Sequence, residues 1–132
     1  MKAILRPLGL HILAAGLFTC SVFPQNPGLQ RTIVHRADVS VPGREAVITR
    51  VEIAPNGRAG RHTHPGDEIT YVLEGEGEIL IEGQPALKIK GGDGFVVPAG
   101  AKHDARNTGA GTLKLVATYV VEKGKPLATP AP

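Results

Sequence analysis

A succession of short β-type segments, separated by turns rich in glycine and proline, most constrains what this chain can fold into. From Val47 to Ile53 every second residue is apolar or threonine, whereas Arg50 and Glu52 lie between them. This alternation is typical of a strand with one buried face. Further β-type segments cover residues 31–39, 69–73, 78–82, 87–90, 95–97 and 112–121. Short strands at even spacing predict an all-β sandwich or a closed barrel.

The length and the turn content favour one domain. The chain has 132 residues, enough for a single hydrophobic core, with 17 glycines and 11 prolines. We predict that residues 24–123 form this domain. Residues 124–132 contain three prolines and little apolar surface, so we predict a disordered tail without regular structure.

The N-terminal residues 1–23 predict a signal peptide. Lys2 and Arg6 accompany an apolar stretch that is shorter than the roughly 20 residues a membrane span needs. We therefore expect a periplasmic or secreted protein without a stable membrane span. A lipid anchor on Cys20, the only cysteine, is the alternative.

The charge balance argues against a protein that binds nucleic acid. The formal net charge is +3, but removal of the leader leaves 13 basic residues against 12 acidic ones. No basic run interleaved with aromatic residues occurs, and we assign Arg58 and Arg61 to a solvated loop.

Three histidines and one glutamate form a candidate metal site. His62 and His64 are two residues apart, so both face the same side of a strand. After a Pro-Gly turn, Glu68 fits the site better than Asp67, because its arm is longer and Asp67 should point the other way. His103 lies about 35 residues downstream of Glu68, so only a folded barrel or sandwich can bring it near. Imidazole and carboxylate groups together suit a divalent transition metal.

Two segments of the chain resemble the motifs of the cupin superfamily, the small double-stranded β-helix proteins. Gly92, Pro98, Gly100, His103 and Asn107 stand at the spacings of the second cupin motif. This motif is complete.

The first cupin motif is matched from its His-x-His onward, by His62, His64, Glu68 and Gly75. The family usually has a glycine six positions before the first histidine, where this chain has Asn56. Because asparagine tolerates a left-handed backbone, we expect the turn to survive.

The resemblance covers about residues 45–121. It implies a double-stranded β-helix (jelly-roll) cupin barrel of the small single-domain type, similar to the quercetin-dioxygenase-like group. It also implies one divalent transition metal (Mn, Fe, Ni, Co or Zn) on His62, His64, Glu68 and His103. The alternative is a barrel that keeps these residues but holds no metal.

The chemistry of such a site leaves three functions open. Three neutral histidines and one carboxylate leave two open positions on an octahedral ion, which suit a bidentate oxygen ligand. A dioxygenase-like enzyme acting on a small oxygenated substrate is favoured. An isomerase or lyase for a sugar acid or another enediol-forming substrate, and a non-catalytic binding module, are the alternatives. In several cupin enzymes of this resemblance the residue equivalent to Glu68 also acts as a base, so Glu68 is the one catalytic candidate.

The sequence also predicts where residues near the candidate ligands lie. Thr70 and Val72 should share the face of Glu68, and Asn107 should fix a loop. Asp104 is expected at the surface. Candidates for the core or the pocket wall are Tyr71, Phe95, Val97 and Tyr119. Exposed strand edges also predict a homodimer, with a small molecule as the other partner.

Overall fold

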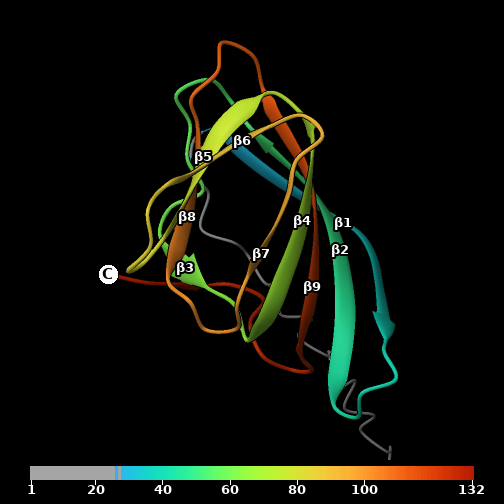
Figure 1. Cartoon of the computed structure of the whole chain (residues 1–132). Coiled ribbons are helices and arrows are strands. Elements are labelled where there is room, and N and C mark those ends of the chain that lie inside the picture. Colours follow the sequence, from blue (N-terminus) through green and yellow to red (C-terminus); the bar gives the residue numbers. More distant parts are fainter. Residues whose placement is uncertain (1–25, 27) are drawn as a thin grey trace, which may run out of the picture.

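The computed structural model describes residue 26 and residues 28–132, and this part of the chain is all-β (Figure 1). The predicted signal peptide, residues 1–23, lies outside the described residues. No helix long and apolar enough to cross a membrane occurs in the described part of the chain. The ten strands are β1 (Leu29–Asp38), β2 (Arg44–Ile53), β3 (His62–Thr63), β4 (Gly66–Glu74), β5 (Glu76–Ile81), β6 (Leu87–Lys90), β7 (Gly94–Val97), β8 (His103–Asn107), β9 (Leu113–Glu122) and β10 (Thr129–Pro130).

Among the described residues, the strands form two five-stranded antiparallel sheets. The first sheet has the order β1-β2-β9-β4-β7 and the second has the order β10-β3-β8-β5-β6. Strands that are distant in the sequence, such as β2 and β9, therefore pair along their whole length. This arrangement confirms the predicted double-stranded β-helix, and the two sheets face each other across a common interior.

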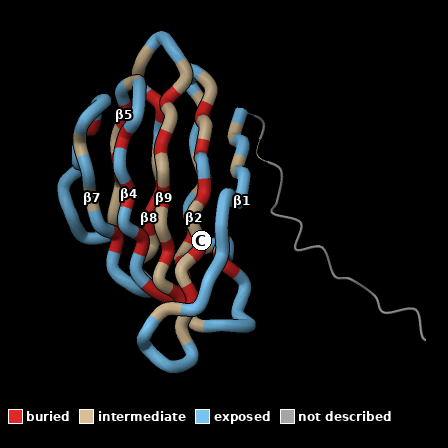
Figure 2. Tube along the Cα trace, turned by 90° about the vertical axis from the view of Figure 1, so that its right-hand side faces the viewer, coloured by how far each residue is buried: buried red, intermediate tan, exposed pale blue. Residues whose placement is uncertain are grey.

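The core lies between the two sheets, as the alternation in the sequence predicted. Along β2 and β9 buried residues alternate with partly buried or exposed ones, which Figure 2 shows as a banded trace. Val47, Ile53 and Leu113 are fully buried there. Aliphatic side chains dominate this core, and the burial of their apolar surface is the main force that holds the sheets together.

The turn before β3 keeps its conformation without the usual glycine. Asn56 has a φ of 60°, in the left-handed region. This confirms the expectation that asparagine would replace glycine at this position of the first motif. The amide of Gly57 then donates to the carbonyl of Ala54 at 2.8 Å and closes the turn.

The expectation of a disordered tail over residues 124–132 is corrected by the structure. Thr129 and Pro130 form the edge strand β10, which pairs with Thr63 and His62 of β3. Leu127 is only 9% exposed and belongs to the core. A proline is compatible with a strand at the edge of a sheet, because its missing N–H can face away from the ladder.

Candidate metal centre

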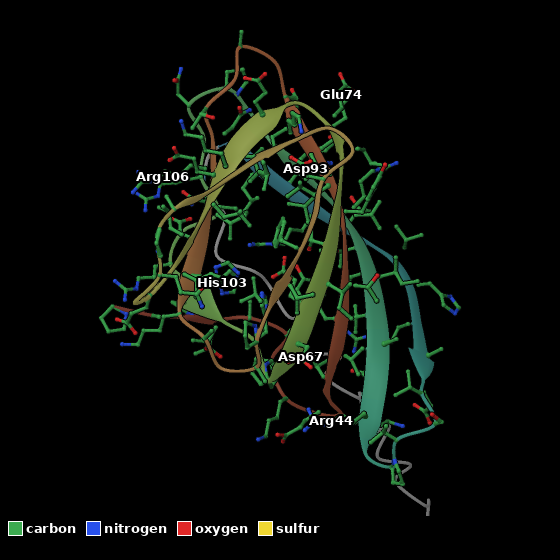
Figure 3. The ribbon with its side chains drawn as sticks, viewed as in Figure 1. Arg44, Asp67, Glu74, Asp93, His103 and Arg106 are labelled. Carbon is green, nitrogen blue, oxygen red and sulfur yellow. The ribbon has the colours of Figure 1, made fainter. Side chains whose placement is uncertain are left out.

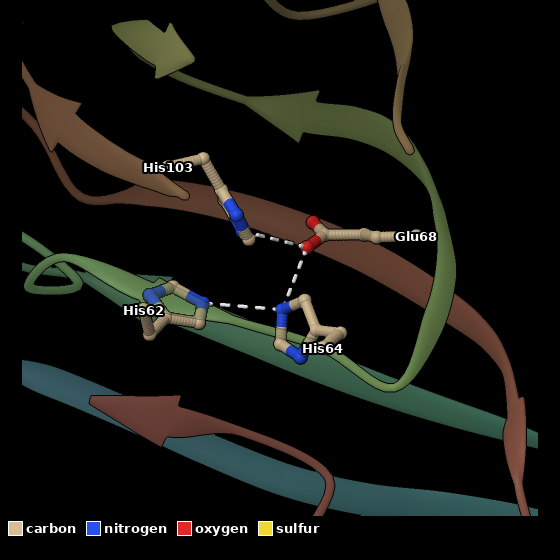
Figure 4. Close-up of side chains that lie close together, drawn as sticks. All are labelled: His62, His64, Glu68 and His103. Atoms are coloured by element: carbon tan, nitrogen blue, oxygen red, sulfur yellow. Dashed lines mark hydrogen bonds and ion pairs between the residues drawn. The ribbon is translucent and has the colours of Figure 1, made fainter. Parts of the chain in front are cut away.

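The fold brings all four predicted ligand side chains together (Figure 4). His62 lies on β3 and pairs directly with His103 at the start of β8. His64 follows β3, and Glu68 reaches across from β4 of the first sheet. The four potential ligand atoms lie within 4.8 Å of one another, and all four residues are buried. The candidate ligands therefore come from both sheets and meet between them.

The Nδ1 atom of each histidine is held by a backbone carbonyl. His62 Nδ1 lies 2.6 Å from the oxygen of Gly60, and His103 Nδ1 lies 2.9 Å from that of Ala101. His64 Nδ1 lies 2.6 Å from the oxygen of Leu127. Since a carbonyl can only accept, each Nδ1 carries the proton and donates it. In a neutral ring held in this way, the lone pair of Nε2 is available to a metal.

These Nε2 lone pairs converge on one another and on the Glu68 carboxylate. The Nε2 atoms of His62 and His64 are 3.1 Å apart. Glu68 Oε2 lies 3.0 Å from Nε2 of His64 and 3.3 Å from that of His103. The buried Nε2 of His103 makes no hydrogen bond. Three imidazole nitrogens and a carboxylate oxygen gathered this closely in a buried site fit a divalent transition metal, which would accept all four donors.

The electrostatics keep the donors in the form that a metal requires. Burial, with the neighbouring His103, lowers the pKa of His62 to about 4. Burial opposes ionisation of Glu68, but the adjacent imidazoles of His103 and His64 and the hydroxyl of Thr70 outweigh it and lower the pKa of that carboxyl. Thr70 Oγ1 donates to Glu68 Oε1 at 2.7 Å, which leaves Oε2 to face the histidines. Near neutral pH the site thus offers neutral imidazole from His62 and an ionised carboxylate.

A small cavity of about 20 Å³ adjoins three of the four residues, His62, Glu68 and His103. Phe95 and Tyr119 line it, as does Arg31 from the edge strand β1. The Tyr119 ring also packs against His64, with 4.5 Å between centroids. Sequence reasoning missed Arg31, because only the pairing of Arg31 with the buried Val51 shows that β1 turns this residue inward.

Several residues near the site lie where the sequence predicted them. Thr70 and Val72 are buried on the face of Glu68, as expected. Asp67 points away and accepts from the amide of Ala99 at 2.9 Å, and Figure 3 shows it at the start of β4. Asn107 fixes a loop through the carbonyl of Gly111, which also agrees.

Two expectations about neighbouring residues are wrong. Tyr71 is 53% exposed and belongs to neither the core nor the pocket wall, because it alternates with the inward-facing Thr70 and Val72. Asp104 is buried rather than at the surface, with a side chain that is 4% exposed and paired with Arg58. Pairing with this buried carboxylate also gives Arg58 a structural role beyond that of a solvated loop residue.

Comparison with known proteins places this site in a family. The model of the cupin domain (Cupin_2) matches residues 49–121, more than half of the chain. The chain belongs to the cupin family. As a cupin, it carries the buried histidine and glutamate cluster on the two matched motifs, and this cluster supports a metal-binding cupin.

This cupin is similar to proteins of different activity. An acireductone dioxygenase of Rhodopseudomonas palustris is 34% identical over 96 residues, which cover 70% of this chain and 52% of the relative. A dimethylsulfoniopropionate lyase of Ruegeria pomeroyi is 42% identical over 45 residues, 34% of this chain and 22% of the lyase. The chain thus spans about half or less of the length of these curated relatives.

Solved structures agree on the fold. A conserved protein with a double-stranded β-helix domain from Klebsiella pneumoniae superposes with a TM-score of 0.64 at 24% identity. The match covers 82% of this chain and 90% of that one.

Proposed function

We propose that this cupin is a metal-dependent dioxygenase for a small substrate with two adjacent oxygen atoms, such as an enediol. The observation that carries the proposal is the buried cluster of three histidines and one glutamate, whose ligand atoms lie within 4.8 Å of one another, with Nε2 of His64 and of His103 both beside Glu68 Oε2. In this proposal His62, His64, Glu68 and His103 hold one ion of Fe, Mn, Ni or Co. Such an ion would supply Lewis acidity and one-electron chemistry with dioxygen, whereas Zn would supply Lewis acidity alone.

The similarity to an acireductone dioxygenase supports this choice of reaction. It extends over 96 residues and 70% of this chain. The cavity of about 20 Å³ has room for about one water molecule, so even a small organic substrate would have to displace side chains that line it.

We assign Glu68 the role of a ligand rather than that of a mobile base. Its Oε1 is held by Thr70 at 2.7 Å, and its Oε2 faces His64 and His103. Release of the carboxylate from this position would break the bond from Thr70 inside a buried site, which costs about 1–3 kcal/mol.

Elemental analysis and oxygen uptake test the proposal together. Protein purified without a His-tag or a chelator is expected to contain one Fe, Mn, Ni or Co per chain and to consume dioxygen with an enediol, a catechol or a diketone. His103→Ala should lose both properties. His35→Ala, an exposed histidine on β1, is the matched control and should keep them. Bound zinc and no oxygen uptake with the whole panel would contradict the proposal.

The second candidate is a lyase without redox chemistry, favoured by the 42% identity to a dimethylsulfoniopropionate lyase over 45 residues. It predicts turnover under anaerobic conditions, whereas the dioxygenase requires oxygen. Stoichiometric metal with tight ligand binding and no turnover would instead indicate the binding module.

Export and the homodimer stay predictions. An N-terminal sequence of the mature protein that starts beyond residue 23 would support a signal peptide. Light scattering that shows a monomer at micromolar concentration would exclude the dimer.

A further inference from the structure

We propose that the outer face of the second sheet carries a binding site for a dianion of the phosphate class, independent of the candidate metal centre and of the proposed function. A surface pocket of about 390 Å³ lies on this face. Of the candidate metal ligands, only His103 borders it. Its charged lining consists of four basic residues and two acidic ones: Arg58, Arg61, Lys102, Arg106, Glu82 and Asp104.

The strand register directs the basic side chains away from the interior. Ala105 pairs with the buried Ile79 and packs against the core, so Arg106, the next residue of β8, points to the opposite face. Figure 3 shows Arg106 on the outside of the second sheet. Lys102 precedes β8, and its carbonyl accepts from the amide of Glu82 at 2.9 Å, which fixes it at the edge of the same pocket.

Two of the four basic side chains already have an acidic partner. Arg58 Nε donates to Asp104 at 2.9 Å, and Arg61 pairs with Glu82. Lys102 and Arg106, by contrast, form no ion pair or side-chain hydrogen bond with any residue that the structure describes. Lys102 is nevertheless partly buried, and a partly desolvated ammonium group is unfavourable without a counter-charge. The lining of the pocket therefore has two positive charges in excess.

Two of these guanidinium groups stand at directly opposite positions. Arg58 and Arg106 form an isolated antiparallel β-bridge, and like charges at such positions repel each other. On its other side Arg106 lies opposite Glu78, which also lies opposite Lys88 and forms an ion pair with neither. An anion bound between Arg58 and Arg106 would replace this repulsion by two attractive contacts.

The charge and the size of the pocket favour a phosphate group. The excess of two positive charges matches a dianion, and arginine binds phosphate through two parallel N–H groups, with lysine as a point charge. The volume lies within the range of about 300–1,000 Å³ that small-molecule sites occupy, so a phosphate group on a small organic molecule also fits. The shared chemistry of both ligands is the phosphate dianion.

Isothermal titration calorimetry of the full chain in a phosphate-free buffer tests the site. The probes are inorganic phosphate and glycerol 3-phosphate, and acetate is the monoanion for comparison. We expect saturable phosphate binding with a Kd of about 1 mM or lower, and binding of acetate that is at least about tenfold weaker. Tighter binding of the ester indicates a phosphorylated small molecule and equal binding indicates free phosphate, and both outcomes support the site.

The variant Lys102→Gln/Arg106→Gln should bind phosphate at least about tenfold more weakly, because it removes two charged hydrogen-bond donors. The matched control is Arg50→Gln/Lys125→Gln, which removes the same charge from ion pairs with Glu52 and Glu122 outside the pocket. This control should keep the wild-type affinity. Circular dichroism establishes that both variants are folded.

A second control separates this site from the metal centre. His62→Asn changes a candidate metal ligand and should leave the phosphate affinity unchanged, whether or not the protein binds a metal. Loss of phosphate binding in His62→Asn, equal weakening by the two double variants, or a wild type without saturable phosphate binding at millimolar concentration would overturn the proposal. Equal affinities for acetate and phosphate would overturn the dianion as its ligand.

Discussion

His64 donates its Nδ1 proton to the backbone carbonyl of Leu127 at 2.6 Å, so the C-terminal tail orients a metal-ligand candidate that lies 63 residues earlier in the chain. The tail is held at two points, at this contact and further along the chain. Leu127 is buried in the core, and the amide of Ala131 donates to the carbonyl of Arg61 at 3.0 Å. The C-terminus is thus part of the site rather than an appendage.

Removal of the tail should weaken metal binding. A chain that ends at Gly124 lacks the carbonyl that fixes the tautomer and ring orientation of His64. Loss of such a partner typically lowers metal affinity by about 10- to 100-fold. Competition with a chelating dye measures the change, and Lys125→Ala is a control that keeps the tail. A truncated protein that is folded and binds metal with wild-type affinity would contradict this role.

Thr70→Val should also lower the metal affinity, because it removes the 2.7 Å hydrogen bond to Glu68 while keeping the size of the side chain. We expect a loss of about tenfold or more in the same competition assay. Thr118→Val provides the comparison, since Thr118 pairs with the exposed Ile69 and shares its outer face. Equal affinities of the two variants would argue against a role for Thr70 in holding the carboxylate.

The metal-free protein should lose stability as the pH falls below about 6.5. Because burial lowers the pKa of His62 to about 4, the unfolded chain binds a proton at this residue between pH 6.5 and pH 4 and the folded chain does not. Its contribution to stability is therefore complete above pH 6.5 and declines toward pH 4. Between pH 7 and pH 5 the loss is about 2 kcal/mol. Urea unfolding of chelator-treated protein measures it, and His62→Asn should flatten this part of the profile.

Arg58→Ala should destabilise the fold far more than Arg61→Ala. Arg58 Nε donates to the buried Asp104 at 2.9 Å, so its removal leaves a buried carboxylate without its counter-charge, at a cost of about 3 kcal/mol. Arg61 pairs with Glu82 at the surface, where such pairs contribute about 0–1 kcal/mol. Denaturant unfolding at neutral pH compares the two variants. A similar small effect of both would contradict a stabilising role of the Arg58–Asp104 pair.

The candidate ligands could be found in the sequence because their geometry is local. His62 and His64 share a side of the chain by the two-residue period of a strand, and a Pro-Gly turn returns Glu68 to the same place. The second motif supplied His103 with its surrounding glycines and prolines. In the same way, alternation along β2 identified Val47, Val51 and Ile53 as core residues before any strand pairing was known.

The burial of Asp104 depends on contacts that no local pattern encodes. Its partner Arg58 lies 46 residues away, in a segment that forms a bridge to the neighbouring Arg106. The sequence next to His103 suggested a surface position because alternation in a strand places neighbours on opposite faces. The guanidinium of Arg58 compensates the charge of the Asp104 carboxylate, which lowers the free-energy cost of burying this side chain.

The sequence by itself determined the all-β class, the positions of the turns and the candidate ligands His62, His64 and Glu68, because each follows from a period or a spacing of a few residues. It indicated His103 through the resemblance of its neighbours to the second cupin motif. Only the tertiary structure decided which nitrogen of each histidine faces the site, since Gly60, Leu127 and Ala101 supply the carbonyls that hold the other nitrogen. The tertiary structure also placed Arg31 at the cavity, through the register of β1 with β2. The contact of His64 with Leu127 and the position of Arg31 depend on pairing between distant segments, whose free energy comes from the assembled core and not from any one stretch of the chain.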